Sequence, residues 1–192
     1  MKRYIVCLGI TITTLLCLIG CSNRESKKDE MTPVKAEWAL EQSTGAEMVT
    51  LDFASEEKVI FHGYFGLFVY DLSEEKITHS LDLKSIGCDS TQGDSYCEVS
   101  VSQEADVIQL HPMNNEKMYV YDIENNILRQ TPYEHMENRF KTIPNENPLG
   151  GVSYETVRFP NGDIGYLEDK NATLDSLYFV VGDKEYKLFT SR

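Results

Sequence analysis

Four histidines are the residues of this sequence best suited to general-base or metal chemistry near neutral pH. They are His62, His79, His111 and His135, and none belongs to a His-Glu-x-x-His metal motif. His62 and His111 occupy equivalent positions in two similar segments, each near the end of a predicted strand. This equivalence favours a role in packing or in a turn, with a zinc pocket or a general base as the alternative. The sequence predicts no cofactor and no metal.

A serine and a lysine occur twice at the spacing used by penicillin-recognising enzymes, in residues 55–58 and 73–76 (Ser-Glu-Glu-Lys). That chemistry needs the serine at a helix N-terminus, with Ser-Asp-Asn and Lys-Thr-Gly elements elsewhere. Neither element occurs in the sequence, and both stretches fall in predicted turns. We therefore interpret them as turn sequences and assign no catalytic residue.

Cys88 and Cys97 are close enough in sequence to pair with each other. The stretch between them contains Gly93 and several turn-forming residues, so a closed loop is feasible. Outside the cytoplasm such a pair is readily oxidised, and a loop of this size contributes about 2–3 kcal/mol in the chain-entropy model. We predict a disulfide, with two free buried thiols as the alternative. Two cysteines without a nearby histidine make only half a zinc site.

Residues 62–66, His-Gly-Tyr-Phe-Gly, are a candidate binding element. Two glycines bracket the aromatic pair, which predicts a tight hairpin where the backbone approaches a partner. Aromatic residues in strands are more often core, because alternate side chains point inward. The candidate binding residues are His62, Tyr64, Phe65 and His111.

Strands must position these side chains, because β-branched and aromatic residues cluster in short runs between polar turns. The runs form an internal repeat, and such a repeat decides the fold. One segment has predicted strands at 49–53, 58–62, 67–72 and 76–81, and a second at 98–102, 106–111, 118–123 and 126–130. A third, fainter copy has strands at 154–159, 164–167, 177–181 and 186–189.

The two stronger copies match best where a strand ends in aspartate and a polar turn follows. Both contain Val-Tyr-Asp, at residues 69–71 and 120–122, and the triplets lie 51 residues apart. We expect the aspartate to accept backbone N–H bonds inside the turn. In the third copy this pattern is lost, and Gly182 and Asp183 predict a tight hairpin.

The sequence therefore predicts an all-β fold of antiparallel four-stranded meanders, repeated about three times. Such meanders resemble the blades of a β-propeller, which have periods of about 40–50 residues. Three blades are too few to close a propeller, since about four are the minimum. The expected arrangement is a partial β-propeller or a sandwich of stacked sheets, with residues 36–40 around Trp38 as an added edge. An ordinary β-sandwich with coincidental hairpin similarity is the alternative.

The net charge of the protein limits the classes of partner that it could bind. The chain has 18 basic and 31 acidic residues, a net charge of −13. An acidic body argues against nucleic acid, because phosphate binding needs clustered lysine and arginine. It also argues against lying flat on anionic lipid.

The N-terminus has the pattern of a secretion signal. Lys2 and Arg3 precede an uncharged, mostly apolar run at residues 5–19. The run is short for a membrane span, which needs about 20 apolar residues, and a short apolar core behind a basic start is typical of a signal peptide. An uncleaved transmembrane anchor is the alternative.

Leu18-Ile19-Gly20-Cys21 resembles the lipobox of bacterial lipoproteins. The resemblance implies cleavage after Gly20 and diacylation of the Cys21 thiol, and two acyl chains anchor a protein stably. Residues 1–20 would be the signal peptide, residues 21–33 a flexible polar tether, and residues 34–192 one β-rich domain. Removing Lys2 and Arg3 would change the net charge from −13 to −15. The expected location is the outer face of the cell membrane.

Several further short sequence segments resemble an extracytoplasmic domain of Firmicutes. They lie at residues 62–72, 80–84, 87–88, 91–94, 96–99, 110–113 and 118–122, within about half the chain, residues 38–133. In that family the domain stands at the C-terminus of membrane metallopeptidases similar to the antirepressors that sense beta-lactams. The resemblance implies an outward-facing domain that folds alone and binds or senses. The protease motif and the penicillin-acylating serine have no counterpart here.

These observations predict a lipid-anchored surface module that binds or senses without catalysis. Its partners would be membrane lipid, through acylated Cys21, and a membrane protein or cell-wall ligand, and not nucleic acid. Two alternatives stay open. One is a small envelope hydrolase that uses a histidine and carboxylates, and the other is an immunity or resistance lipoprotein that blocks a toxic molecule at the membrane.

Overall fold

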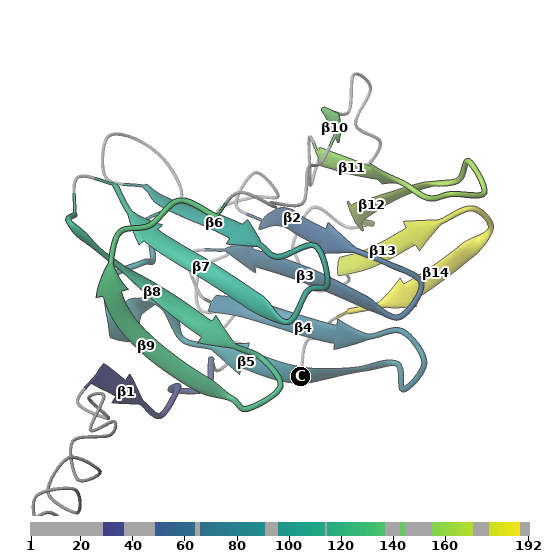
Figure 1. The fold of residues 1–192 in the computed structure, drawn as a ribbon. Coiled ribbons are helices and arrows are strands. Elements are labelled where there is room, and N and C mark those ends of the chain that lie inside the picture. Colours follow the sequence, from purple (N-terminus) through teal and green to yellow (C-terminus); the bar gives the residue numbers. More distant parts are fainter. Residues whose placement is uncertain are drawn as a thin grey trace, which may run out of the picture.

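The computed structural model describes residues 29–36, 49–63, 66–90, 96–113, 115–136, 143–144, 155–170 and 177–188. Almost all of their regular structure is antiparallel β-sheet, arranged in three sheets (Figure 1). Among these residues, a search for helices long and apolar enough to cross a membrane finds none.

Each sheet is built around one meander in which strands follow one another in sequence. The central sheet has the order β2 (Val49–Ala54), β3 (Lys58–Gly63), β4 (Gly66–Asp71), β5 (Lys76–Leu81). The second sheet has the order β6 (Cys97–Val101), β7 (Val107–Pro112), β8 (Lys117–Asp122), β9 (Ile127–Pro132), and β1 (Glu30–Met31) pairs with β9. The third has the order β10 (Ile143–Pro144), β11 (Glu155–Arg158), β12 (Ile164–Asp169), β13 (Leu177–Val181), β14 (Lys184–Lys187).

The predicted repeat of three four-stranded meanders is therefore confirmed. Each strand expected in the three copies overlaps an observed strand, and the fold class is all-β. None of the three sheets closes on itself, and they form open, sandwich-like layers. Trp38 and residues 37–40, expected as an added edge, lie outside the described residues.

The turns of the two stronger copies have the predicted chemistry. The Asp71 carboxylate accepts backbone N–H bonds from Ser73 and Glu74, both at 2.8 Å. Asp122 accepts one from Asn125 at 3.0 Å. The Ser73 hydroxyl and the Asn125 N–H lower the pKa of Asp71 and of Asp122, respectively, below the ordinary value.

The third copy uses a different turn, also as predicted. Val181 pairs with Lys184, which leaves Gly182 and Asp183 as a two-residue loop. Gly182 has a φ of 57°, a left-handed conformation that glycine adopts without steric cost.

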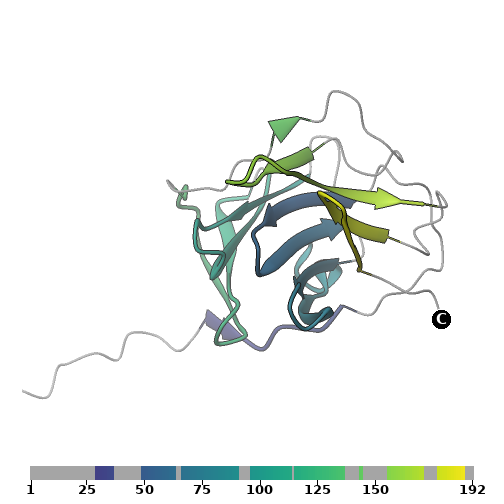
Figure 2. The same cartoon turned by 90° about the vertical axis from the view of Figure 1, so that its right-hand side faces the viewer.

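The central sheet is covered on both faces. In Figure 2 the third sheet, in yellow-green, lies on one side of the blue central sheet and the second sheet lies on the other. Residues of β2, β3 and β4 such as Leu51, Phe61 and Phe68 pack with Phe159 and Phe179 of the third sheet's segment. Because both faces are buried, β3 and β4 are apolar over successive residues and not only at alternate ones.

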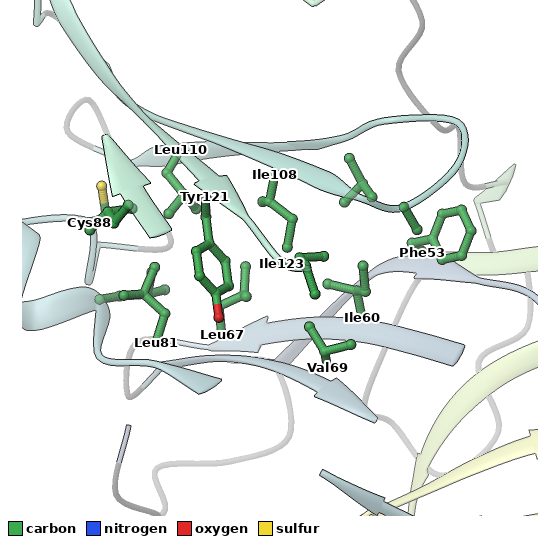
Figure 3. Packing of buried hydrophobic residues seen from close by; sticks show 14 of the residues in the cluster. Phe53, Ile60, Leu67, Val69, Leu81, Cys88, Ile108, Leu110, Tyr121 and Ile123 are labelled. Carbon is green, nitrogen blue, oxygen red and sulfur yellow. The ribbon is translucent and has the colours of Figure 1, made fainter. Parts of the chain in front are cut away.

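The opposite face of the central sheet forms the core with the second sheet. Ile60, Leu67 and Val69 point from the central sheet toward Ile108 and Tyr121 (Figure 3). Tyr121 is fully buried, and its hydroxyl donates a hydrogen bond to Asn126 at 2.8 Å. A polar tip that finds a partner at the turn lets this large ring fill the core without leaving an unpaired hydroxyl.

The last residues of the predicted flexible tether, residues 30–33, pack on the sheets. Glu30 pairs with Arg129 and Met31 with Leu128, so these residues add a short edge strand to the second sheet. Pro33 is buried, and the Val34 carbonyl accepts a 2.7 Å hydrogen bond from the Asp82 N–H after β5. This strap, residues 30–36, joins the outer edges of two sheets, a non-local pairing that its polar composition does not indicate.

The packing of Gly165 on β12 gives a stability prediction. A Cβ at this position would lie 2.7 Å from the Phe179 ring and 2.8 Å from the Phe159 ring. Gly165→Ala should therefore lower the free energy of unfolding by about 1–3 kcal/mol, because the rings must move within a packed core. Urea unfolding measures this change, and Phe179→Leu in the Gly165→Ala background should recover part of the loss. An unchanged stability in Gly165→Ala would show that the two aromatic rings do not pack on this glycine.

Candidate functional site

The strongest polar feature of the described core is an ion pair between Asp52 and His62. Asp52 Oδ2 lies 2.7 Å from His62 Nδ1, and the side chains of His62 and Asp52 are only 9% and 5% exposed. His62 is near the end of β3, on the face that Ile60 shares with the second sheet. The sequence predicted His62 as a candidate but missed its partner.

A β-bulge places Asp52 in the core. The pairing of β2 with β3 shifts between Leu51 and Phe53, so Asp52 is the extra residue on β2. Leu51 packs toward the third sheet and Phe53 toward the second. A bulge re-aims side chains in this way, and the regular apolar-polar alternation of Leu51-Asp52-Phe53 gives no sequence signal of it.

The pair lies where the three sheets meet. Strand β2 contacts β6 of the second sheet and β11 and β12 of the third. The negative charges of Asp52 on β2 and Glu155 on β11 both act on His62. The Asp52 charge also acts on Cys97 at the start of β6.

Burial and charge oppose each other at this pair. Burial alone would lower the pKa of His62, but the Asp52 charge and hydrogen bond, with the Glu155 charge, raise it above the ordinary value. Burial raises the pKa of Asp52, and the contact with His62 only partly offsets this rise. The folded protein therefore holds protons at this pair more tightly than the unfolded chain does.

Cys88 and Cys97 are brought together, as the sequence predicted, but the disulfide is not present. Both are buried free thiols, 1% and 5% exposed. The hydrogen bond with Cys88, burial and the charges of Asp52 and Glu98 all raise the pKa of Cys97. Disulfide exchange needs the thiolate, so the raised pKa of Cys97 slows its oxidation in the folded protein.

His111 has the equivalent strand position to His62 but a different environment. On β7 the core residues are Ile108 and Leu110, so His111 lies on the opposite, outward face of the second sheet. Its ring stacks on Tyr133 with centroids 3.9 Å apart, and Nε2 lies 2.9 Å from the Asn115 carbonyl oxygen. Nδ1 is buried and has no hydrogen-bond partner among the described residues. The stack gives His111 a packing role.

The remaining candidate residues either lie in turns, where they make local hydrogen bonds, or lie outside the described residues. Ser55 Oγ accepts the N–H bonds of Glu57 and Lys58, and Ser73 Oγ donates to Asp71. Both Ser-x-x-Lys matches are therefore turn sequences. Cys21, Tyr64 and Phe65 lie outside the described residues.

The arrangement at Asp52 and His62 holds an imidazole in one orientation, as catalytic dyads do. Here, however, the ring is enclosed, and a substrate would have to displace core side chains to reach it. Within the described ranges, no three residues of the types His, Cys, Asp and Glu are grouped so as to hold a metal ion. The geometry therefore fits a polar joint between the three sheets.

Comparison with known families and curated proteins does not assign this site. No protein-family model matches it, and no curated protein matches its sequence.

The joint makes folding stability depend on pH. Unfolded histidine loses its proton near pH 6.5, whereas folded His62 keeps its proton to higher pH. His62 therefore contributes its full stabilisation below about pH 6.5. This contribution is lost as the pH rises through the folded pKa, by about 1.4 kcal/mol for each unit by which the folded pKa exceeds the unfolded one. Urea unfolding between about pH 7 and 8, below the range in which unfolded cysteine ionises, should show this decline in the unaltered protein and not in His62→Gln.

His79→Gln is the matched control for that measurement. Burial and the charges of Lys58 and Lys35 lower the pKa of His79, so its proton linkage lies below about pH 6.5. This variant should keep the decline above pH 7. An equal slope in the unaltered protein and in His62→Gln would contradict the protonated pair.

Proposed function

We propose that this chain is a bacterial lipoprotein whose β-domain binds or senses at the outer face of the cell membrane, without catalysis. The observation that carries the proposal is Leu18-Ile19-Gly20-Cys21 behind a short apolar run with a basic start. Acyl chains on Cys21 would hold the domain, since each buried methylene contributes about 0.8 kcal/mol. The resemblance to an extracytoplasmic Firmicutes domain belongs to the same proposal.

The described fold supports an exported binding domain. Its apolar side chains form two cores, one on each face of the central sheet, while the protein carries a large negative charge. A net charge far from zero keeps a protein soluble and repels it from an acidic cell surface. The tether would therefore hold a compact, water-soluble body beside the membrane.

The enclosed histidine supports binding over hydrolysis. A general base must reach the proton it abstracts, at about 2.6–3.2 Å or through one water. His62 is fixed against Asp52 in the core, and His111 is stacked on Tyr133 with Nε2 directed at a backbone carbonyl. Neither ring has the access that the hydrolase alternative requires.

The same proposal includes a disulfide between Cys88 and Cys97. The two buried thiols are neighbours that interact with each other, and the compartment outside the cytoplasm favours their oxidation. Exchange with the disulfide of a thiol oxidase would take two electrons and two protons from the pair and form one S–S bond. The oxidised loop would restrict the unfolded chain.

A thiol assay tests this bond in the protein isolated from membranes without reductant. Peptides containing Cys88 and Cys97 should be linked, and reduction should lower the free energy of unfolding by about 2–3 kcal/mol. The double variant Cys88→Ser, Cys97→Ser should show no effect of reductant. Free thiols in the protein as isolated would refute the bond.

Replacing the acylated cysteine tests the anchor. Cys21→Ser removes the thiol that receives the lipid, so the protein should lack the lipid mass and retain residues 1–20, whose apolar run would itself hold it at the membrane. Cys88→Ser is the matched control, since it removes a thiol that the anchor does not use. Removal of residues 1–20 from Cys21→Ser to the same extent as from the control would refute lipid processing at this residue.

A further inference from the structure

Exposed apolar side chains lie at the end of the sheets from which the strap leads back toward Cys21. The described residues have five well-exposed large hydrophobics, and four of them are Met31, Val34, Tyr96 and Tyr133, with exposed fractions of 38–53%. The fifth, Ile143, lies in the third sheet. Single exposed apolar residues are ordinary, but Val34, Tyr96 and Tyr133 lie at the same end of the two sheets, which we call the anchor-side rim, whereas Met31 lies farther along β9, opposite Leu128.

The two tyrosines of the rim lie at the same end of the second sheet. Tyr96 directly precedes β6, and its carbonyl accepts a 2.9 Å hydrogen bond from the Met113 N–H just after β7. Tyr133 directly follows β9, and its N–H donates to the Glu116 carbonyl at 2.9 Å. The stack on His111 holds the Tyr133 ring in place while leaving it 43% exposed.

Val34 lies at the corresponding end of the central sheet. Its carbonyl is bonded to Asp82, the residue that follows β5. The contact of Cys88 with Cys97 brings the end of β5 and the start of β6 together. Figure 3 shows Leu81, Cys88 and Leu110 at this end of the core, away from Phe53 and Ile60.

The length of chain between Cys21 and Asp29 limits how the domain can face the membrane. Eight residues span at most about 26–29 Å when fully extended. A domain of this size has a radius of gyration of about 15 Å, and hence a diameter of roughly 40 Å. The chain is therefore too short for the far end of the sheets to face the bilayer while acyl chains on Cys21 are inserted.

We propose that the anchor-side rim is a docking surface for the lipid bilayer, an inference that rests on the proposed anchor at Cys21. Tyrosine rings favour the membrane–water interface because they combine an apolar body with a polar tip. Val34 adds apolar surface, and the acyl chains supply the attachment that a few such side chains cannot.

The charges at the rim are compatible with a lipid surface. Exposed Lys35, Lys84 and Lys117 lie next to the rim segments, alongside five exposed acidic residues, Asp29, Glu30, Asp89, Glu116 and Glu134. This region therefore carries both signs of charge, and its lysines can face the headgroup phosphates. Docking here places an uncharged aromatic and apolar edge, with lysines beside it, on the headgroups.

Depth-dependent quenching tests the docking with the full lipidated protein. In a Trp38→Phe background, Tyr133→Trp reports from the rim, and Tyr178→Trp on β13 of the third sheet is the matched control. Both proteins are inserted into vesicles of phosphatidylethanolamine and phosphatidylglycerol that contain brominated lipid. Quenching of the indole at position 133 should be at least twofold stronger than at 178.

The outcomes separate the docking from the anchor. Equal quenching of two vesicle-bound proteins would overturn the docking and leave the anchor intact. Failure of both proteins to associate with vesicles would overturn the anchor and the docking together. In the protein with native tyrosines, an amine reagent should label Lys117 at least twofold more slowly relative to Lys187 in the vesicle-bound form than in the same lipidated protein in detergent. An unchanged labelling ratio would also overturn the docking.

Discussion

The burial of both faces of the central sheet is the constraint on which the rest of the structure depends. A sheet covered on one side can keep polar residues on the other, but β3 and β4 have neighbours above and below. Their side chains must therefore be apolar at successive positions. The second and third sheets each cover one face, so the domain becomes a stack of layers instead of three separate hairpin units.

The same constraint explains why one ion pair needs such specific surroundings. Charges removed from water are stabilised only when they are paired and hydrogen-bonded. The bulge at Asp52 supplies the partner for His62, and Glu155 adds a second negative charge from the third sheet. A polar contact at the meeting point of three sheets can fix their relative register, because a slipped strand would leave a buried charge without a partner.

Local sequence patterns were sufficient to predict the strands and most turns. The Val-Tyr-Asp triplets and the Gly182-Asp183 pair are short-range signals, and hairpin register depends on residues close in sequence. The order of the layers was not predictable in this way, because it depends on which faces of distant segments pack together. The pairing of Glu30 with Arg129 was missed for the same reason, since a charged segment gives no local signal of an edge strand.

The candidate site was predicted in part. Cys88 and Cys97 were brought together because a short loop joins them, whereas their oxidation depends on conditions that no local pattern records. His62 and His111 share a strand position, but one faces a covered layer and the other an uncovered face, which decides their different contacts. Asp52 was missed because its place depends on a bulge, an exception to regular alternation.

The proposed role joins this layered body to a membrane through one residue, and that covalent link is directly measurable. Intact-mass and peptide analysis of the native protein, extracted from membranes with detergent, should find Cys21 as the N-terminal residue, with its sulfur carrying a diacylglyceryl group. A native protein that retains residues 1–20 and has an unmodified Cys21 sulfur would contradict the account.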